Sequence, residues 1–234
     1  MINNKNIHYV NLVDQWQSEK DELLPIIEKV LSLGHYVNGI DIDDFEEQVS
    51  KFCGVKYAIA LNSGTDALTF ALALSGIRHG DEVITTPNSF IATAAAIVHL
   101  GAKPVFIDVN EDQNINVDLI EAAITENTKA ILPVHLTGRM SDMDSIMKIS
   151  KKYNLTVIED SAQAIGSKFR SKLSGSYGKV GCFSTHPLKN LNACGDGGFL
   201  TTNDPIIYEK AGILRSHGLV SREQSNQFGY VSRM

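Results

Sequence analysis

A junction at residues 61–66 has the residue types of an anion-binding loop. An apolar run ends at Leu61, and Ser63, Gly64 and Thr65 lead from it directly into a helix-forming segment. The free N–H groups and positive dipole end of a helix N-terminus attract a phosphate, and the Thr65 hydroxyl adds a donor. The alternative is that Ser63 or Thr65 simply caps the helix. This junction alone leaves both functions open.

Two adjacent carboxylates, Glu159 and Asp160, end the strand-like run LTVIED. Burying a carboxylate there costs free energy unless a cation or a hydrogen-bond donor meets it. A protonated pyridine nitrogen is one such partner. The alternative is that Asp160 caps the turn that follows, as aspartates often do. The pair therefore indicates either a charged ligand or a local turn.

Lys189 lies in a polar, glycine-rich loop between two expected strands. A lysine in such a loop is usually a solvated surface charge. Here Ser184 and His186 come just before it, and the run GDGG at 195–198 comes just after it. These neighbours favour a chemical role for the lysine over a plain surface position.

Short apolar runs alternate with helical segments, and this alternation places the polar groups at one edge of a sheet. Strand-like runs rich in Val and Ile are expected at 57–62, 82–87, 103–109, 129–136 and 155–160. They are too apolar for a sheet with one solvent face, which is typical of βαβ units around a parallel sheet. Ligands of such sheets bind beyond the carboxyl ends of the strands. We therefore expect an α/β fold with its site at that edge.

The other expected elements complete one domain. Helical periodicity is present at 10–34, 41–54, 65–76, 89–101, 117–125, 141–154 and 204–218, and shorter strands are expected near 167–170, 180–185 and 197–203. The simplest partition is a helical N-terminal arm, 1–54, followed by one large α/β domain, 55–234.

Composition excludes several classes of protein. A formal charge of -6 gives no basic surface for nucleic acid. No apolar run approaches the roughly 20 residues of a membrane span, and the first residues do not resemble a signal peptide, so we expect a cytoplasmic protein. The three cysteines and the histidines lack the spacing of a disulfide framework or a metal site. No GxGxxG follows the first strand, which counts against a dinucleotide-binding domain.

Three ordered motifs in the sequence resemble one known family. They are SGTDALTFAL at 63–72, IEDSAQAIGS at 158–167, and FSTHPLKNLNACGDGG at 183–198 followed by TTND. In order and spacing they are similar to the DegT family of sugar-nucleotide aminotransferases, which depend on pyridoxal 5'-phosphate (PLP). The similarity extends from about residue 8 to the last residue. Three motifs in order are far more specific than any one of them.

The resemblance implies PLP as the cofactor and the three-layer α/β/α large domain of the PLP-dependent aminotransferase fold, with a mostly parallel sheet. In that family the lysine of the KN pair holds the cofactor as a Schiff base, which implies this role for Lys189. The aspartate of the ED pair, Asp160, would contact the pyridine nitrogen, so these two are the implied catalytic residues. The further implied cofactor-binding residues are Gly64, Thr65 and Ser184 at the phosphate, Phe90 stacked on the ring, and Gln163 beside the ring hydroxyl.

The resemblance also implies an activity and a partner. An amino acid, usually glutamate in this family, would load the cofactor, and a keto-sugar linked to a nucleotide would accept the amino group in amino-sugar biosynthesis. Family members form homodimers. Two alternatives stay open: a PLP-dependent sugar dehydratase, which usually carries histidine in place of Lys189, and a truncated or non-catalytic relative that only binds PLP.

Two departures from the family pattern concern the end of the sequence. Family members commonly continue into a smaller C-terminal domain, whereas this sequence ends at Met234, so we expect a truncated chain that lacks this domain. Val231 stands where the family often has an asparagine that reaches the cofactor of the partner subunit. That contact therefore lacks its usual residue here.

Overall fold

The computed structural model describes residues 8–34 and 36–234, which divide into two compact units, one ending at Gly39 and one beginning at Ile40. The first unit contains α1 (Leu12–Ser32), whose N-cap Asn11 accepts a hydrogen bond from the backbone N–H of Asp14. None of the residues of α1 is buried. Residues 1–7 and 35 of the predicted arm lie outside the described residues.

The second unit carries the sheet. Its elements in chain order are α2 (Ile40–Cys53), β1 (Tyr57–Leu61), α3 (Gly64–Leu74), β2 (Glu82–Thr85), α4 (Ala92–His99), β3 (Lys103–Phe106), η1 (Val117–Leu119), η2 (Glu121–Ala123), β4 (Thr128–Ile131), η3 (Leu136–Gly138), α5 (Met143–Tyr153), β5 (Thr156–Asp160), β6 (Lys168–Phe169), β7 (Lys172–Leu173), β8 (Val180–Ser184), β9 (Gly198–Thr202) and α6 (Pro205–Leu214).

Seven strands form one mixed sheet in the order β1-β9-β8-β5-β4-β2-β3. The pairs β8-β5, β5-β4, β4-β2 and β2-β3 are parallel, whereas β9 runs antiparallel to both β1 and β8. Because β9 reverses direction between them, β1 and β8 still point the same way. The carboxyl ends of β1, β8 and β5 therefore lie at one edge of the sheet, and the expected α/β fold with a mostly parallel sheet is confirmed.

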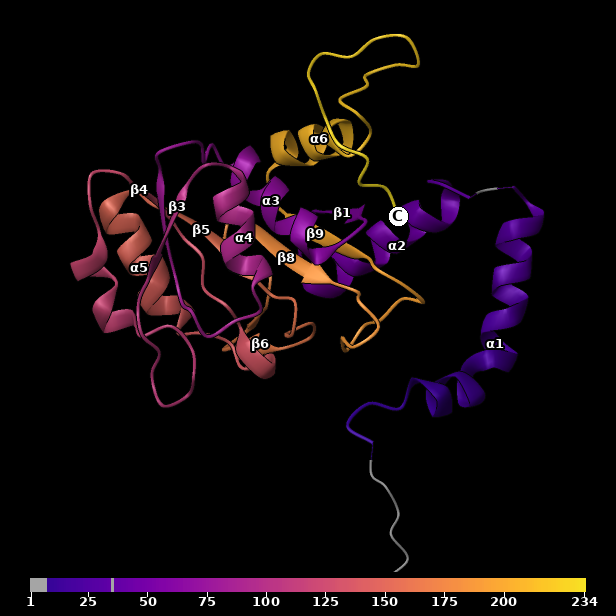
Figure 1. Cartoon of the computed structure of the whole chain (residues 1–234), viewed down its shortest axis with the longest axis horizontal. Helices are drawn as coiled ribbons and strands as arrows, with labels where there is room; N and C mark the ends of the chain where they lie inside the picture. The colour runs from indigo at the N-terminus through magenta and orange to yellow at the C-terminus, as the bar shows by residue number, and fades with distance from the viewer. Residues whose placement is uncertain (1–7, 35) are drawn as a thin grey trace, which may run out of the picture. The chain divides into compact units, whose positions relative to one another are not determined.

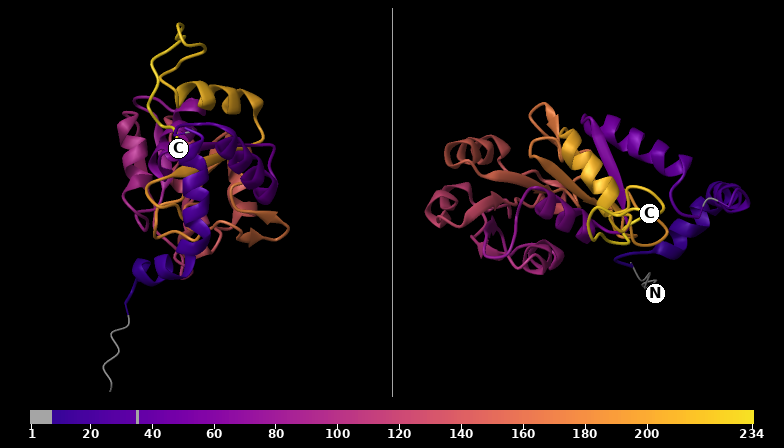
Figure 2. Two further views of the ribbon diagram at one scale, coloured as in Figure 1. Left: turned by 90° about the vertical axis from the view of Figure 1, so that its right-hand side faces the viewer. Right: turned by 90° about the horizontal axis from the view of Figure 1, so that it is seen from above.

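Helices cover both faces of this sheet, as Figures 1 and 2 show. Helices α3, α4 and α6 pack on one face, and α5 and α2 pack on the other. Neighbouring strand residues divide between the faces: Ala130 belongs to the core under α3, and Ile131 belongs to the core under α5. Side chains alternate along a strand, so a strand buried on both faces must be apolar throughout. This explains the continuous apolar runs of the sequence.

Two regions differ in detail from the expected elements. The segment 117–125 forms the two short 3₁₀ turns η1 and η2 in place of one helix. The Asn116 side chain accepts from the Asp118 N–H at 3.1 Å and starts the first turn, and Ile120 is the only buried residue of the described turns and their junction. With so little surface to bury, a longer helix gains little from packing.

Helix α2 packs on β1 within the second unit, although the predicted arm included it; the division into arm and large domain stays a prediction.

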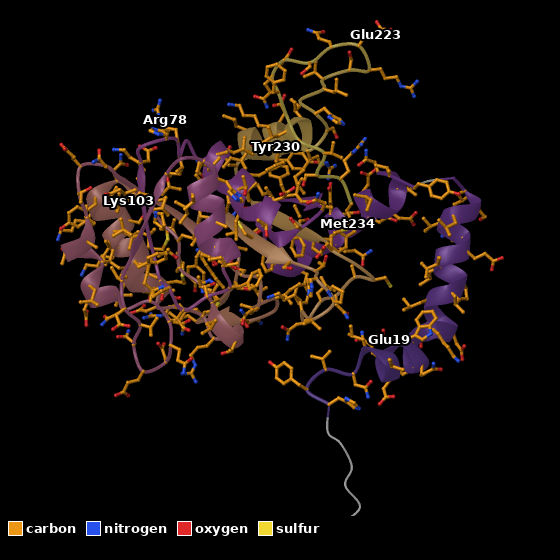
Figure 3. All side chains as sticks on the ribbon, viewed as in Figure 1. Glu19, Arg78, Lys103, Glu223, Tyr230 and Met234 are labelled. Atoms are coloured by element: carbon orange, nitrogen blue, oxygen red, sulfur yellow. The ribbon has the colours of Figure 1, made fainter. Side chains whose placement is uncertain are left out.

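The segment after α6 folds back on the second unit. Figure 3 labels Tyr230 and Met234 on this segment. The Tyr230 N–H donates to the Leu214 carbonyl at 2.8 Å, and its ring lies 5.3 Å from that of Phe70. The Asn62 side chain donates to the Val231 carbonyl at 3.2 Å. These contacts hold the segment beside the carboxyl end of β1.

Candidate active site

A cavity of about 300 Å³ opens at the edge of the sheet where β1, β5 and β8 end. The segments around it are the start of α3, the start of α4, the end of β5 and the loop between β8 and β9. Its wall includes all seven residues that the sequence predicts for the site, namely Gly64, Thr65, Phe90, Asp160, Gln163, Ser184 and Lys189. The fold thus brings together in one place residues that lie more than a hundred positions apart in the chain.

The first turn of α3 forms one side of the cavity. Ser63 is the N-cap, and its hydroxyl accepts from the Asp66 N–H at 3.0 Å, which confirms the capping alternative for this residue. The N–H groups of Gly64 and Thr65 belong to the first turn, where no intrahelical acceptor is available. A Cβ atom at position 64 would lie 2.7 Å from the Cβ of Ser184. Glycine therefore allows α3 to start directly against the end of β8.

Glu159 and Asp160, although adjacent, have separate environments. Glu159 is fully buried, and its carboxylate accepts the N–H groups of Gly175, Tyr177 and Gly178 at 2.7–2.9 Å. Its Oε2 also lies 3.0 Å from the Nε2 of His135. Four donors inside the protein satisfy this carboxylate, so it needs no ligand.

Asp160 lies at the cavity with fewer partners. Its Oδ2 accepts from the Thr93 hydroxyl at 2.7 Å and its Oδ1 from the Ala162 N–H at 3.2 Å. The second contact is the turn-capping bond of the alternative interpretation, so Asp160 both caps a turn and lines the cavity. Among the described residues it forms no ion pair within 4.0 Å. Burial raises the pKa of the Asp160 carboxyl, and the bonds from Thr93 and Ala162 and the positive charge of Lys189 oppose this shift.

The loop after β8 places Lys189 in the cavity wall. The Lys189 N–H donates to the His186 carbonyl at 2.8 Å, and the His186 N–H donates to the Ser184 hydroxyl at 3.2 Å. Lys189 is half-buried, whereas His186 is exposed. A half-buried lysine in the wall of a cavity differs from the solvated surface charge of the alternative interpretation.

Phe90 and Gln163 complete the predicted set. Phe90 is 70% exposed at the start of the segment that leads into α4, so its ring is available to a ligand in the cavity. The side-chain carbonyl of Gln163 accepts from the Thr137 N–H at 3.0 Å. This bond fixes the Gln163 amide with its NH₂ group as the end that remains to donate.

The sequence places the chain in a family whose model matches residues 17–234, the DegT/DnrJ/EryC1/StrS aminotransferase family. The chain belongs to this family. The motifs at 63–72, 158–167 and 183–198 had indicated the same family, and that prediction is confirmed.

Two curated relatives illustrate the range of this family. The chain is 43% identical, over its whole length and 64% of the relative, to UDP-N-acetyl-3-dehydro-alpha-D-glucosamine 3-aminotransferase of Acidithiobacillus ferrooxidans. It is 40% identical, over 98% of its length and 62% of the relative, to a pleiotropic regulatory protein of Geobacillus stearothermophilus. The chain thus spans less than two thirds of the length of either relative.

Solved structures of the family have the same fold. The chain superposes on S. venezuelae DesV in complex with a ketimine intermediate with a TM-score of 0.94 and 36% identity, covering 97% of this chain and 62% of DesV. It superposes on NtdA of Bacillus subtilis with bound PMP with a TM-score of 0.90 and 36% identity, covering 99% of this chain and 54% of NtdA. The expected fold of the PLP-dependent aminotransferases is thereby confirmed.

Three further residues of the cavity wall were not among the predicted site residues. Ser89, Thr93 and Asp196 also line the cavity, and Thr93 contacts Asp160 directly. Ser89 and Thr93 are four residues apart within 89–101, where the sequence predicts a helix, and in a helix that spacing places two hydroxyls on one face; in the structure α4 begins only at Ala92. That spacing was a possible signal, but it is common, and nothing local in the sequence connects Thr93 with Asp160.

Two further features are absent from residues 8–34 and 36–234. No helix in this part of the chain is long and apolar enough to span a membrane. No group of three or more His, Cys, Asp or Glu side chains there is arranged to hold a metal ion.

Proposed function

We propose that this chain binds PLP and is the cofactor-binding part of an aminotransferase that moves an amino group from an amino acid, glutamate in our proposal, to a keto-sugar linked to a nucleotide. One observation carries the proposal: Lys189, the buried Asp160 and the first residues of α3 line the same cavity. The names of the aminotransferase relative and of the PMP-bound NtdA structure support it.

The cavity fits the charges of PLP. The buried Asp160 has only neutral donors within hydrogen-bond distance, and a protonated ring nitrogen would supply the missing positive charge. The N–H groups of Gly64 and Thr65 at the start of α3, with the Ser184 hydroxyl beside them, suit a phosphate. PLP has a dianionic phosphate at one end and a cationic ring nitrogen at the other. The phosphate matches the start of α3, and the ring nitrogen matches Asp160.

Bound PLP supplies an electron sink for the carbanion that forms at the amine-bearing carbon. Asp160 holds a proton on the ring nitrogen, because its carboxylate favours the charged form of that nitrogen. Lys189 would hold the cofactor covalently through Nζ, and as a free amine the same Nζ would act as the general base and acid at the substrate carbon.

The remaining residues bind and orient. Phe90 stacks on one face of the ring, and its exposed position at the cavity leaves it free to do so. Gln163 donates from its NH₂ group to the ring hydroxyl, since its carbonyl is already held by Thr137. We also propose that the protein forms a homodimer, that glutamate is its amino donor and that it is located in the cytoplasm.

A second candidate is a relative that binds PLP without turnover. The similarity to the pleiotropic regulatory protein favours this candidate. A sugar dehydratase is less well supported, because Lys189 stands where related dehydratases have histidine.

The test is an absorbance spectrum of the purified chain with PLP, before and after borohydride reduction, followed by peptide mass mapping. We expect a band in the imine region that reduction fixes onto Lys189, and no such labelling in Lys189→Ala. Scattered labelling of surface lysines, or no band, would contradict the cofactor site. Transfer of the amino group from glutamate to the bound cofactor then separates the aminotransferase from the PLP-binding relative, which would give the band without the transfer.

A further inference from the structure

Thr93 connects the start of α4 with the carboxylate of Asp160. Its hydroxyl oxygen lies 2.7 Å from Oδ2 of Asp160 and 2.7 Å from the hydroxyl oxygen of Ser89. Thr93 is 2% exposed, and Asp160 is 5% exposed. The contact is therefore largely shielded from water, where a hydrogen bond to a charge is strong.

Proton counting fixes the direction of this chain of hydroxyls. A threonine hydroxyl has one proton, and an ionised carboxylate can only accept. Thr93 must therefore donate to Asp160, and it has to accept the proton of Ser89 on its other side. With Asp160 ionised, the three side chains form one directed series from Ser89 through Thr93 to Asp160.

We propose that Thr93, held in turn by Ser89, is a positioning residue that keeps the carboxylate of Asp160 ionised and fixed in the wall of the cavity. The inference rests on the proposed function for its catalytic consequence, because an ionised Asp160 is what holds the proton on the ring nitrogen. The effect of Thr93 on the charge of Asp160 does not itself depend on PLP. Without the Thr93 hydroxyl, the buried carboxylate retains one hydrogen bond, the longer one from Ala162 at 3.2 Å.

The other titratable groups around Asp160 cannot replace this donor. Lys189 and His135 stabilise the charge only through space, and neither contacts the carboxylate within hydrogen-bond distance. Cys182 pairs with Asp160 across β5 and β8, and burial raises the pKa of its thiol, so the thiol stays neutral and does not stabilise the carboxylate charge. Thr93 is thus the only side chain of the described residues with a hydrogen bond to this carboxylate.

The test compares Thr93→Val, which keeps the shape and removes the hydroxyl, with Thr93→Ser, which keeps the hydroxyl. The readout is a pH titration of the apoprotein by ¹³C NMR with aspartate labelled at the side-chain carboxyl carbon, and Asp160→Asn identifies the Asp160 signal. We expect the titration midpoint of Asp160 to rise by about one pH unit or more in Thr93→Val, since a hydrogen bond to a charged group is worth about that much. Thr93→Ser should titrate like the wild type.

Ser89→Ala gives an independent measurement if Thr93→Val does not fold. It removes the donor behind Thr93, and we expect a smaller rise of the same midpoint. An unchanged midpoint in Thr93→Val, or in Ser89→Ala if that variant alone folds, would overturn the proposal.

PLP binding separates this inference from the proposed function. In Thr93→Val we expect the apparent dissociation constant for PLP to rise about tenfold, the equivalent of one pKa unit, with little change in Thr93→Ser. A wild-type chain that does not bind PLP would refute the proposed function, while the apoprotein titration would still decide whether Thr93 holds the charge of Asp160.

Discussion

Glu159 and Asp160 are neighbours at the end of β5, and their carboxylates are satisfied by different parts of the protein. Glu159 accepts from the turn at 175–178 and lies beside His135, whereas Asp160 accepts from Thr93 at the start of α4 and lines the cavity. Alternation along a strand separates the two side chains. The Glu159 carboxylate therefore stabilises the fold, and the Asp160 carboxylate remains available to a ligand.

Replacing Glu159 by Gln should destabilise the protein. The amide has the size of the carboxylate, but its NH₂ group would face N–H donors at Gly175 or at Tyr177 and Gly178. We expect a loss of about 3 kcal/mol in the free energy of unfolding, measured with urea. The exposed Glu126→Gln is the matched control and should change it by less than about 0.5 kcal/mol. If Glu159→Gln loses as little as the control, the buried hydrogen bonds of Glu159 contribute little to the free energy of unfolding.

Asp160→Asn should change the pH dependence of the apoprotein's stability. Burial raises the pKa of Asp160 in the folded state, so protonated Asp160 favours the fold at low pH. This contribution is lost as the pH rises through the folded-state pKa. The neutral amide does not titrate, so the variant should gain stability relative to the wild type between acid and neutral pH in urea unfolding experiments. If the free energy of unfolding depends on pH in the same way in both proteins, this prediction is wrong. The control is Asp44→Asn, at an exposed position.

The same Asp160→Asn change should weaken the cofactor site while it stabilises the empty protein. An amide cannot balance the positive charge of a protonated ring nitrogen. We expect the apparent dissociation constant for PLP to rise about tenfold or more, corresponding to at least 1.4 kcal/mol. Equal affinity of the two proteins in an absorbance titration would argue that Asp160 does not face the ring nitrogen.

Gly64→Ala should disturb the junction between α3 and β8. The added Cβ would lie 2.7 Å from that of Ser184, so the helix must shift at the wall that we assign to the phosphate. We expect a loss of about 1–3 kcal/mol in stability and weaker PLP binding. Gly212→Ala in α6 is the control, because nothing lies within 4 Å of its added Cβ, and alanine in a helix should be neutral or stabilising by about 0.5–1 kcal/mol. Urea unfolding and PLP titration of both variants test this pair.

Thiol labelling should distinguish the three cysteines. Burial raises the pKa of Cys53 to about 12, and it also raises that of Cys182, whereas Cys194 is exposed. The thiolate is the reactive form, so Cys194 should react alone in the native protein at pH 8 and all three should react in denaturant. Mass mapping after labelling checks this. Rapid reaction of Cys53 in the native state would indicate local opening between α2 and β1.

The sequence by itself predicted most of the elements and the residues that line the cavity. The apolar runs around Ile131 and Val157 predicted strands buried on both faces, because a strand between two layers must be apolar on every side chain. The ordered motifs around Gly64, Asp160 and Lys189 indicated the family, and these residues do line one cavity. Such features are local: they depend on periodicity and on residue types close together in the chain.

The tertiary structure alone decided which donors form hydrogen bonds with the buried carboxylates. Nothing in the sequence pairs Thr93 of α4 with Asp160 of β5, or Glu159 with the turn at 175–178 that precedes β8, since each pair forms only when these segments pack together. The antiparallel direction of β9 and the 3₁₀ turns at 117–123 are likewise set by which neighbours are available. A buried carboxylate takes its donors from whatever lies within about 3 Å in space, and spatial proximity of this kind is a property of the folded chain as a whole.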